Sequence, residues 1–427
     1  MAGVYKNVLV WDAGRKKAEK CDVVLNGAQI SSVLPAGTAT GETLFDGKGN
    51  AALIPGFINA HTHIAMSLLR GLGEDLPLME WLNTRIWPVE NKLTAEITGT
   101  GTQIGMMEML STGTTSFIDM YFFMENVADA ALDAGMRCNL TRAVVGGPEG
   151  EAKLAEGLRL ADVYHGAKGL VTVSVAPHAC YTVPDELMQK TVQAALDKKL
   201  NIHFHWLETE WERSYLKENG HDSPEKYLSD FGFMDAKHLL LAHGVWISPE
   251  DTPFYAKKNV TVAHNPKSNL KLASGVAHVP EMLANAVNVA LGTDGAASNN
   301  RLDLWDELRF AALLHKGVNR DPVIVSAEQA LTMATRSAAA ALGYDNLGLI
   351  QPGYLADFVL IDLDQPHYIG CDEQNLAGFI VYAGSSKDVL RTVVNGTELY
   401  VKGEFKTIDK EKVIADARAA RDFLTKN

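Results

Sequence analysis

The chain has 427 residues and a formal net charge of −13, with 47% hydrophobic and 21% charged residues. This composition predicts an ordinary globular protein, large enough for one big core and an accessory domain. The acidic balance argues against a nucleic-acid or anionic membrane surface, since either would need a basic face. We therefore expect a small molecule as the partner, and neither nucleic acid nor a membrane.

The four cysteines are widely spread and form no Cys-x-x-Cys motif. They predict neither a thiolate zinc site nor a disulfide framework, and reduced thiols are typical of the cytosol. The first twenty residues contain no apolar stretch long enough for a signal peptide, and no apolar run is long enough to cross a membrane. We therefore expect a cytoplasmic protein.

Both ends of the chain show short strand-like runs joined by turns. The strongest hairpin signals are Asn26-Gly27 near the start and Asn395-Gly396 near the end. Because chain ends commonly meet in a domain interrupted by an insertion, residues 1–57 and 348–427 are predicted to build one small β-sandwich domain. A final helix is expected from Lys410 to Leu424, where charged and small residues alternate at helical spacing.

Between the two ends, residues 58–347 alternate apolar β-rich runs with stretches that carry apolar residues three and four positions apart. Apolar strands alternating with helices imply a parallel sheet, and eight such units predict a closed (β/α)₈ TIM barrel as the catalytic domain. An open doubly wound sheet is the alternative. The predicted strands cover residues 53–60, 114–119, 137–144, 171–177, 201–206, 239–243, 260–264 and 288–293.

Histidines and one aspartate stand at the ends of four of these runs. His61 and His63 are two residues apart, so in a strand both would point to the same face, and neutral imidazole suits zinc or iron. His205 and His243 end the fifth and sixth runs, and Asp294 follows the eighth. Only a closed ring brings the first and last strand ends to one mouth, where barrel active sites lie. This favours the barrel over the open sheet.

Five segments along the chain, PGFINAHTH, HFHWLE, LAHGV, AHNPKSNLKLASG and LGTDGAASNN, together resemble the amidohydrolase superfamily. More closely, they are similar to its branch of 5-methylthioadenosine/S-adenosylhomocysteine deaminases and related chlorohydrolases. Each motif is short, but the ordered set is specific and covers nearly the whole chain. The resemblance implies a metal-dependent hydrolase that acts on C–N bonds of cyclic amidines.

By this resemblance, His61, His63, His205 and Asp294 hold one divalent metal per chain. Zn²⁺ is the expected ion, with Fe²⁺ or Mn²⁺ as alternatives. His203 shares a strand face with His205 and is the alternative ligand, but only His205 has a glutamate three residues later.

The resemblance also implies the catalytic roles. Glu208 would deliver a proton to the purine N1 and later carry one to ammonia. Asp294 would accept the proton of the attacking water, and His243 would orient the hydroxide or stabilise the tetrahedral oxygen. His264 is interpreted as a support of the barrel mouth.

Further positions match substrate contacts of the family, in addition to Glu208 and Asp294. Glu90 matches the residue that holds the ribose hydroxyls, which suits a carboxylate because it can accept from two vicinal OH groups. His178 matches a contact to the purine ring, Ser298 a polar contact beside the metal aspartate, and Arg142 a contact to the distal end of the substrate.

The chain departs from the family pattern after Arg142. The relative best equipped for a substrate carboxylate has a second arginine shortly downstream, but residues 143–158 contain only Lys153 as a cation. Arg159 falls in the next helical stretch and is interpreted as a solvated residue. The missing second arginine therefore argues against substrates that bear a carboxylate.

The predicted function is hydrolytic deamination of adenosine-type nucleosides by a metal-bound hydroxide, giving the inosine analogue and ammonia. 5-Methylthioadenosine and adenosine are the expected substrates, S-adenosylhomocysteine is a further candidate, and a homo-oligomer is expected. The alternative is a deaminase or chlorohydrolase of another amino-heterocycle, of the guanine or triazine type. A two-metal cyclic-amide hydrolase is disfavoured because VTVSVAPHA has no bridging lysine. A binding scaffold is disfavoured by the intact ligand set, and a cytidine-deaminase site by the missing Pro-Cys-x-x-Cys.

Overall fold

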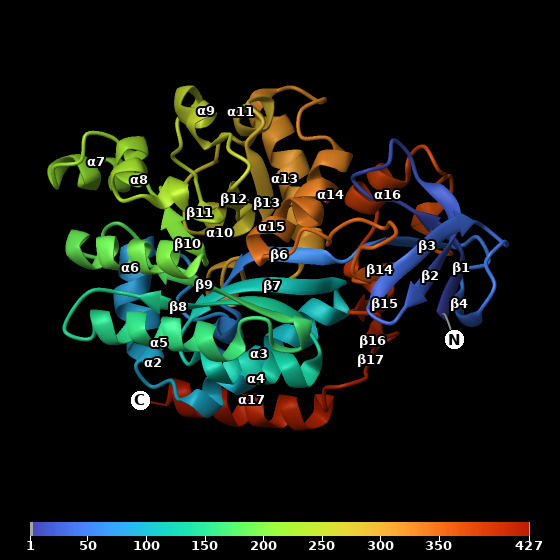
Figure 1. The fold of residues 1–427 in the computed structure, drawn as a ribbon, viewed down its shortest axis with the longest axis horizontal. Coiled ribbons are helices and arrows are strands. Elements are labelled where there is room, and N and C mark those ends of the chain that lie inside the picture. The colour runs from blue at the N-terminus through green and yellow to red at the C-terminus, as the bar shows by residue number, and fades with distance from the viewer. Residues whose placement is uncertain (1–2, 427) are drawn as a thin grey trace.

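The computed structural model describes residues 3–426, and within them the strands form two sheets (Figure 1). In the larger unit, eight parallel strands follow one another in chain order. They are β6 (Phe57–Thr62), β7 (Thr114–Tyr121), β8 (Arg137–Val144), β9 (Val171–Pro177), β10 (Asn201–Trp206), β11 (Leu239–His243), β12 (Val260–His264) and β13 (Asn288–Leu291). The backbone N–H of Asp294, just after β13, donates to the carbonyl of His61 in β6 at 3.0 Å. The last strand thus returns to the first, which confirms the predicted (β/α)₈ barrel.

Helices cover the outside of the barrel, and their ends follow local sequence signals. Helix α14 begins with a capping box in which Ser326 and Gln329 each bond the other's backbone N–H, and α4 ends at Gly135, whose φ of +76° suits glycine. The barrel helices are α1 (Leu78–Trp81), α2 (Trp87–Glu90), α3 (Ala95–Ser111), α4 (Met124–Ala134), α5 (Gly150–Tyr164), α6 (Asp185–Lys198), α7 (Trp211–Glu218), α8 (Pro224–Asp230), α9 (Thr252–Tyr255), α10 (Pro266–Lys271), α11 (Val279–Ala284), α12 (Ala296–Asn299), α13 (Leu304–Asn319), α14 (Ala327–Ala334) and α15 (Ala339–Leu342).

The apolar run 53–60, predicted as one barrel strand, is two strands. Strand β5 (Ala51–Pro55) belongs to the second sheet, whereas β6 begins the barrel at Phe57. A Cβ on Gly56, between them, would lie 2.1 Å from the side chain of Thr115. The chain crosses from one sheet to the other at this point, where only glycine fits. The prediction of a single strand was wrong because hydrophobicity does not change at the junction.

Both chain ends contribute to the second sheet, as predicted, and among the described residues it contains nine strands. Strand β5 lies between β1 and β14, which places an early strand beside a late one. The sheet bends back on itself. This bend brings Tyr5 of β1 close to β16, where its hydroxyl donates to Glu398 at 3.0 Å. Besides β5, its strands are β1 (Gly3–Val10), β2 (Glu19–Asn26), β3 (Gln29–Pro35), β4 (Glu42–Asp46), β14 (Phe358–Asp362), β15 (Val389–Val394), β16 (Thr397–Val401) and β17 (Glu404–Phe405).

A buried ion pair joins the barrel to the second sheet. The Arg137 guanidinium at the start of β8 donates from Nε to Asp357 Oδ2 at 2.7 Å and from Nη2 to Oδ1 at 3.1 Å. The side chains are 0% and 1% exposed. Arg137 also donates to the carbonyl of Gly169 and to Asn395, and it lies over the ring of Tyr344. This bidentate contact fixes one sheet against the other.

Two helices of the C-terminal segment lie on the barrel rather than on the second sheet. Helix α16 (Leu376–Tyr382) packs against α13 and α14, and α17 (Lys410–Thr425) packs against α3, at the positions drawn in Figure 1. The predicted helix from Lys410 to Leu424 is thus confirmed. The division into a composite domain of residues 1–57 and 348–427 and a barrel of 58–347 stays a prediction.

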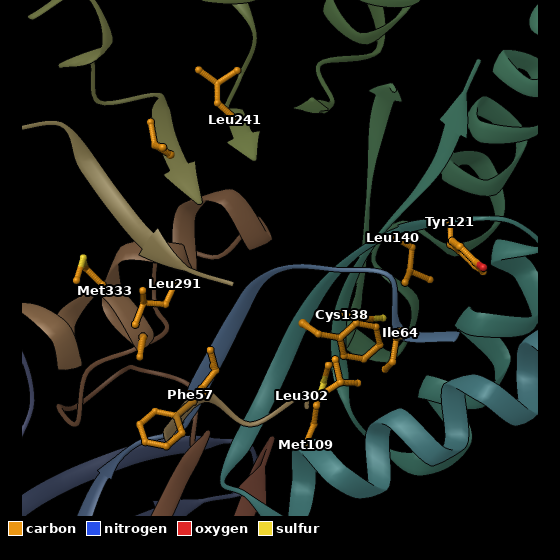
Figure 2. Packing of buried hydrophobic residues seen from close by; sticks show 14 of the residues in the cluster. Phe57, Ile64, Met109, Tyr121, Cys138, Leu140, Leu241, Leu291, Leu302 and Met333 are labelled. Atoms are coloured by element: carbon orange, nitrogen blue, oxygen red, sulfur yellow. The ribbon is translucent and has the colours of Figure 1, made fainter. Parts of the chain in front are cut away.

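The main apolar cluster fills the space between the barrel strands and their helices. Figure 2 shows members on strands, such as Cys138, Leu140 and Leu241, and on helices, such as Met109 and Met333. Among residues 3–426, none of the helices combines the length and the apolar character that crossing a membrane requires.

Candidate active site

Four histidines and an aspartate converge at the C-terminal mouth of the barrel. Two overlapping groups, His61 with His205 and His243, and His61 with His63 and Asp294, each have their ligand atoms within 4.8 Å of one another. His61, His205 and His243 lie on β6, β10 and β11, His63 follows directly after β6, and Asp294 lies in the loop after β13. The barrel therefore brings together all four predicted metal ligands, and His243 lies with them.

Backbone carbonyls fix the orientation of two of the rings. Nδ1 of His63 lies 2.5 Å from the carbonyl oxygen of Met120, and Nδ1 of His205 lies 2.9 Å from that of His178. Each Nδ1–H can donate to its carbonyl, which leaves Nε2 as the ligand atom. Histidines that bind metals in proteins usually use the second ring nitrogen in this way.

His61 is the ring shared by both groups, and its environment tests whether a metal fits. Its Nδ1 lies 2.9 Å from Nε2 of His203, so His203 orients His61 from behind. Its Nε2 is buried and makes no hydrogen bond within the described residues, although it lies 3.5 Å from Asp294 Oδ1. A buried nitrogen without a partner is costly, and burial lowers the pKa of His61 to about 3. The neutral ring and its free Nε2 fit a divalent metal.

Asp294 supplies the negative charge of the cluster. Its Oδ2 accepts hydrogen bonds from Ser268 at 2.6 Å and Ser298 at 2.8 Å, while Oδ1 lies 3.2 Å from Nε2 of His63. Burial opposes its charge, but the His61 and His63 rings hold the pKa of Asp294 well below its usual range. Burial likewise opposes a charge on His63, yet the bond with Asp294 raises the His63 pKa to about 9. The Asp294 carboxylate therefore stabilises a positive charge placed among the histidines.

Backbone strain also marks this mouth. Asp294 has a φ of +60° and His243 a φ of +75°, a region that non-glycine residues rarely adopt. Such residues cost on the order of 1–3 kcal/mol and persist where the surroundings hold them. Nδ1 of His243 lies 2.9 Å from the side-chain oxygen of Asn269, and Asn265 is within 3.3 Å of the same nitrogen.

Glu208 lies in the loop after β10, close to the histidine cluster. It is 7% exposed, and its Oε2 lies 3.7 Å from Nε2 of His243. Burial raises the pKa of Glu208, although His243 opposes the shift. This environment favours a carboxyl that keeps its proton closer to neutral pH.

A cavity of about 800 Å³ opens beside the cluster. Its wall includes every predicted substrate contact, namely Glu90, Arg142, His178, Glu208, Asp294 and Ser298. Oε1 of Glu90 accepts a hydrogen bond from the hydroxyl of Tyr121 at 2.7 Å. The second oxygen of Glu90 makes no hydrogen bond to the described residues. His178 lies beside the ring of His205, with centroids 4.7 Å apart.

The predicted distal contact, Arg142, is engaged within the protein. Its Nε lies 2.6 Å from Glu156 and its Nη1 donates to the carbonyl of Ala143 at 2.8 Å. The guanidinium also lies 5.2 Å from the ring centroid of Phe122. Arg159 reaches the cavity rim but is 63% exposed and pairs with Glu125, consistent with a solvated helix residue.

Sequence reasoning missed several supporting side chains. Ser268 and Asn269 lie within the AHNPKSNLKLASG segment, so their place in a functional motif was a usable signal. Tyr121 ends β7, and polar residues at that end of a barrel strand are often functional. His264 pairs with His315 at 3.2 Å, and its role as a support of the barrel mouth stays an interpretation.

Comparison with known proteins agrees with this geometry. A 5-methylthioadenosine/S-adenosylhomocysteine deaminase of Dictyoglomus thermophilum is 44% identical over 377 residues, covering 88% of this chain and 87% of that protein. A 5'-deoxyadenosine deaminase of Methanocaldococcus jannaschii is 40% identical over 428 residues, covering 98% and 99%. The structure of an adenosine deaminase from Xanthomonas campestris with bound zinc superimposes with a TM-score of 0.94 at 32% identity, covering 99% of this chain and 98% of that one. Residues 52–399 match the amidohydrolase family, and the chain belongs to this family.

Proposed function

We propose that this protein is a hydrolytic deaminase of adenosine-type nucleosides such as 5-methylthioadenosine and adenosine. Water replaces the exocyclic amine, so the products are the inosine analogue and ammonia. The observation that carries the proposal is one cavity with Glu208 beside the histidine cluster and Glu90 on its wall. The names of the deaminase relatives support the same reaction class.

His61, His63, His205 and Asp294 would hold one divalent metal, and zinc is the proposed ion because the Xanthomonas structure contains it. A bound zinc lowers the pKa of its water from 15.7 to about 7 in the best-studied case, which makes hydroxide available at neutral pH.

The proton transfers are assigned to two carboxyl groups. Asp294 would accept the proton of the attacking water, because its carboxylate lies 3.5 Å from His61 and 3.2 Å from His63, two of the residues that would hold the metal. Glu208 can give its proton to N1 of the purine and later return one to the leaving amine, because burial raises its pKa. His243, 3.7 Å from Glu208, would donate a hydrogen bond to the oxygen that adds to the ring. Each of these groups lines the cavity.

Substrate recognition is assigned to the cavity wall. Tyr121 holds one oxygen of Glu90, so the other can accept from the ribose hydroxyls. His178 would contact the purine and Ser298 would hold Asp294. Because Arg142 is already paired with Glu156, uncharged 5' groups should be preferred to a carboxylate. A homo-oligomer and a cytoplasmic location stay predictions.

The test is the release of ammonia from a panel of amino-substituted heterocycles. We expect the highest kcat/KM for 5-methylthioadenosine or adenosine, and lower values for S-adenosylhomocysteine, guanine and amino-triazines. Glu208→Gln is the control, since its amide cannot carry a proton; it should keep the metal and lose about 10²–10⁴ in kcat. Guanine or a triazine turned over faster than every nucleoside would contradict the proposal.

A further inference from the structure

Glu212 is a buried carboxylate that the reaction does not use directly. It lies in the first turn of α7, four residues after Glu208, and is 1% exposed. The preceding residue, the apolar Trp211, is 48% exposed, so at this point of the helix the charged side chain is buried and the apolar one is not. None of the ion pairs within residues 3–426 includes Glu212. A buried carboxylate is retained at such a cost only where it accepts several hydrogen bonds.

The bonds that Glu212 accepts lie on both sides of Glu208. Oε2 accepts from the backbone N–H of Leu207 at 3.0 Å, and Oε1 accepts from that of Thr209, also at 3.0 Å. The hydroxyl of Thr209 and the thiol of Cys180 lie at 3.5 and 3.9 Å. The carboxylate therefore bridges the two amides that flank the proton donor.

The backbone between these amides is strained. Leu207 has a φ of +48°, although it carries a branched side chain. This turn leads the chain out of β10 and directs Glu208 toward His243. A conformation of this kind needs external bonds to persist. The backbone N–H of Trp246 supplies one, to the carbonyl of Leu207 at 3.0 Å, and Glu212 supplies the bonds to the flanking amides.

We infer that Glu212 is a positioning residue: its carboxylate clamps the amides of Leu207 and Thr209 and thereby sets where the carboxyl of Glu208 lies. This inference rests on the proposed function, in which Glu208 carries the proton. General acid catalysis needs the donor within about 3 Å of the acceptor, and a small misplacement can cost about a hundredfold in rate. The clamp acts on Glu208 without touching the substrate.

The first test uses Glu212→Gln, whose amide offers one acceptor oxygen and must turn its NH₂ toward the other backbone N–H. Glu212→Ala removes both acceptors, and Glu218→Gln, an exposed change at the end of the same helix, is the control. We expect Glu212→Gln to lose about tenfold to a hundredfold in kcat, with KM and metal content close to wild type. The control should stay within twofold. Unchanged kcat in both Glu212 variants would overturn the inference.

A double mutant separates positioning from a general structural effect. If Glu212 acts through Glu208, the variant Glu208→Gln/Glu212→Gln should be no slower than Glu208→Gln alone, because the donor is already lost. Losses that multiply would overturn the clamp and leave the role of Glu208 standing.

Hydrogen exchange tests the clamp without any turnover. In metal-loaded Glu212→Gln or Glu212→Ala, the amides of Leu207 and Thr209 should exchange about tenfold faster or more, while the strands of the barrel keep their protection. Unchanged exchange at both amides would overturn the clamp. A wild-type protein inactive on every nucleoside would instead refute the proposed function. The exchange rates of the Leu207 and Thr209 amides would then be the only test of whether Glu212 clamps them.

Discussion

Removing one partner of the Arg137–Asp357 pair should weaken the whole protein. In Asp357→Asn the volume is kept, but the guanidinium loses its counter-charge while its side chain stays 0% exposed. The contacts to Gly169, Asn395 and the Tyr344 ring remain, and they carry no full negative charge. Breaking a buried pair in this way typically costs about 3–5 kcal/mol. This is a large share of the roughly 5–15 kcal/mol by which native proteins are usually stable.

The assay is denaturant unfolding of the metal-loaded protein at a fixed metal concentration. The matched control is Asp230→Asn in α8, whose pair with Lys226 spans 2.6 Å but has side chains 54% and 51% exposed. Exposed pairs contribute about 0–1 kcal/mol, so the control should barely move the midpoint. Replacing both partners, as Arg137→Met/Asp357→Leu, should recover much of the loss because no buried charge is left. The reasoning is refuted if Asp357→Asn loses no more than the control.

The remaining predictions concern the site. Elemental analysis of purified, metal-replete protein should find one divalent metal per chain; two per chain, or none, would contradict the ligand assignment. Glu90→Ala should lower kcat/KM about tenfold to a hundredfold for nucleosides, since bonds to a charged acceptor are worth about 1.5–3 kcal/mol. The kcat/KM for free adenine should not change. An equal loss for adenine would show that Glu90 does not act through the ribose hydroxyls. Glu156→Gln should release Arg142 and raise kcat/KM for S-adenosylhomocysteine relative to 5-methylthioadenosine, by about fivefold or less because Glu156 is half exposed. An unchanged ratio would show that Arg142 does not reach the substrate carboxylate.

The barrel could be predicted from the sequence because its strands are buried on both faces and therefore read as continuous apolar runs. The same property concealed the junction at Gly56, since β5 and β6 are both fully buried although they belong to different sheets. Periodicity reports burial and not the sheet to which a strand belongs.

The candidate ligands could be predicted because strand ends place His61, His205 and Asp294 at one mouth. The contacts that orient these ligands could not be predicted from the sequence. His203 has the same strand face as His205, yet its ring bonds to His61, and the two-residue rule does not show which ring takes which role. The Arg142–Glu156 pair likewise depends on how α5 lies over β8, which no spacing in the sequence specifies.

The position of β5 between β1 and β14 has a consequence for biosynthesis. Strand β5 is made early, but the strand that covers its second edge follows roughly 300 residues later. At about 5–20 residues per second, a ribosome needs on the order of 15–60 s to reach it. Throughout that interval an apolar strand presents an unpaired edge, which invites pairing with other nascent chains. Chains that terminate before Phe358 should therefore aggregate or depend on chaperones, even when all eight barrel strands have been made.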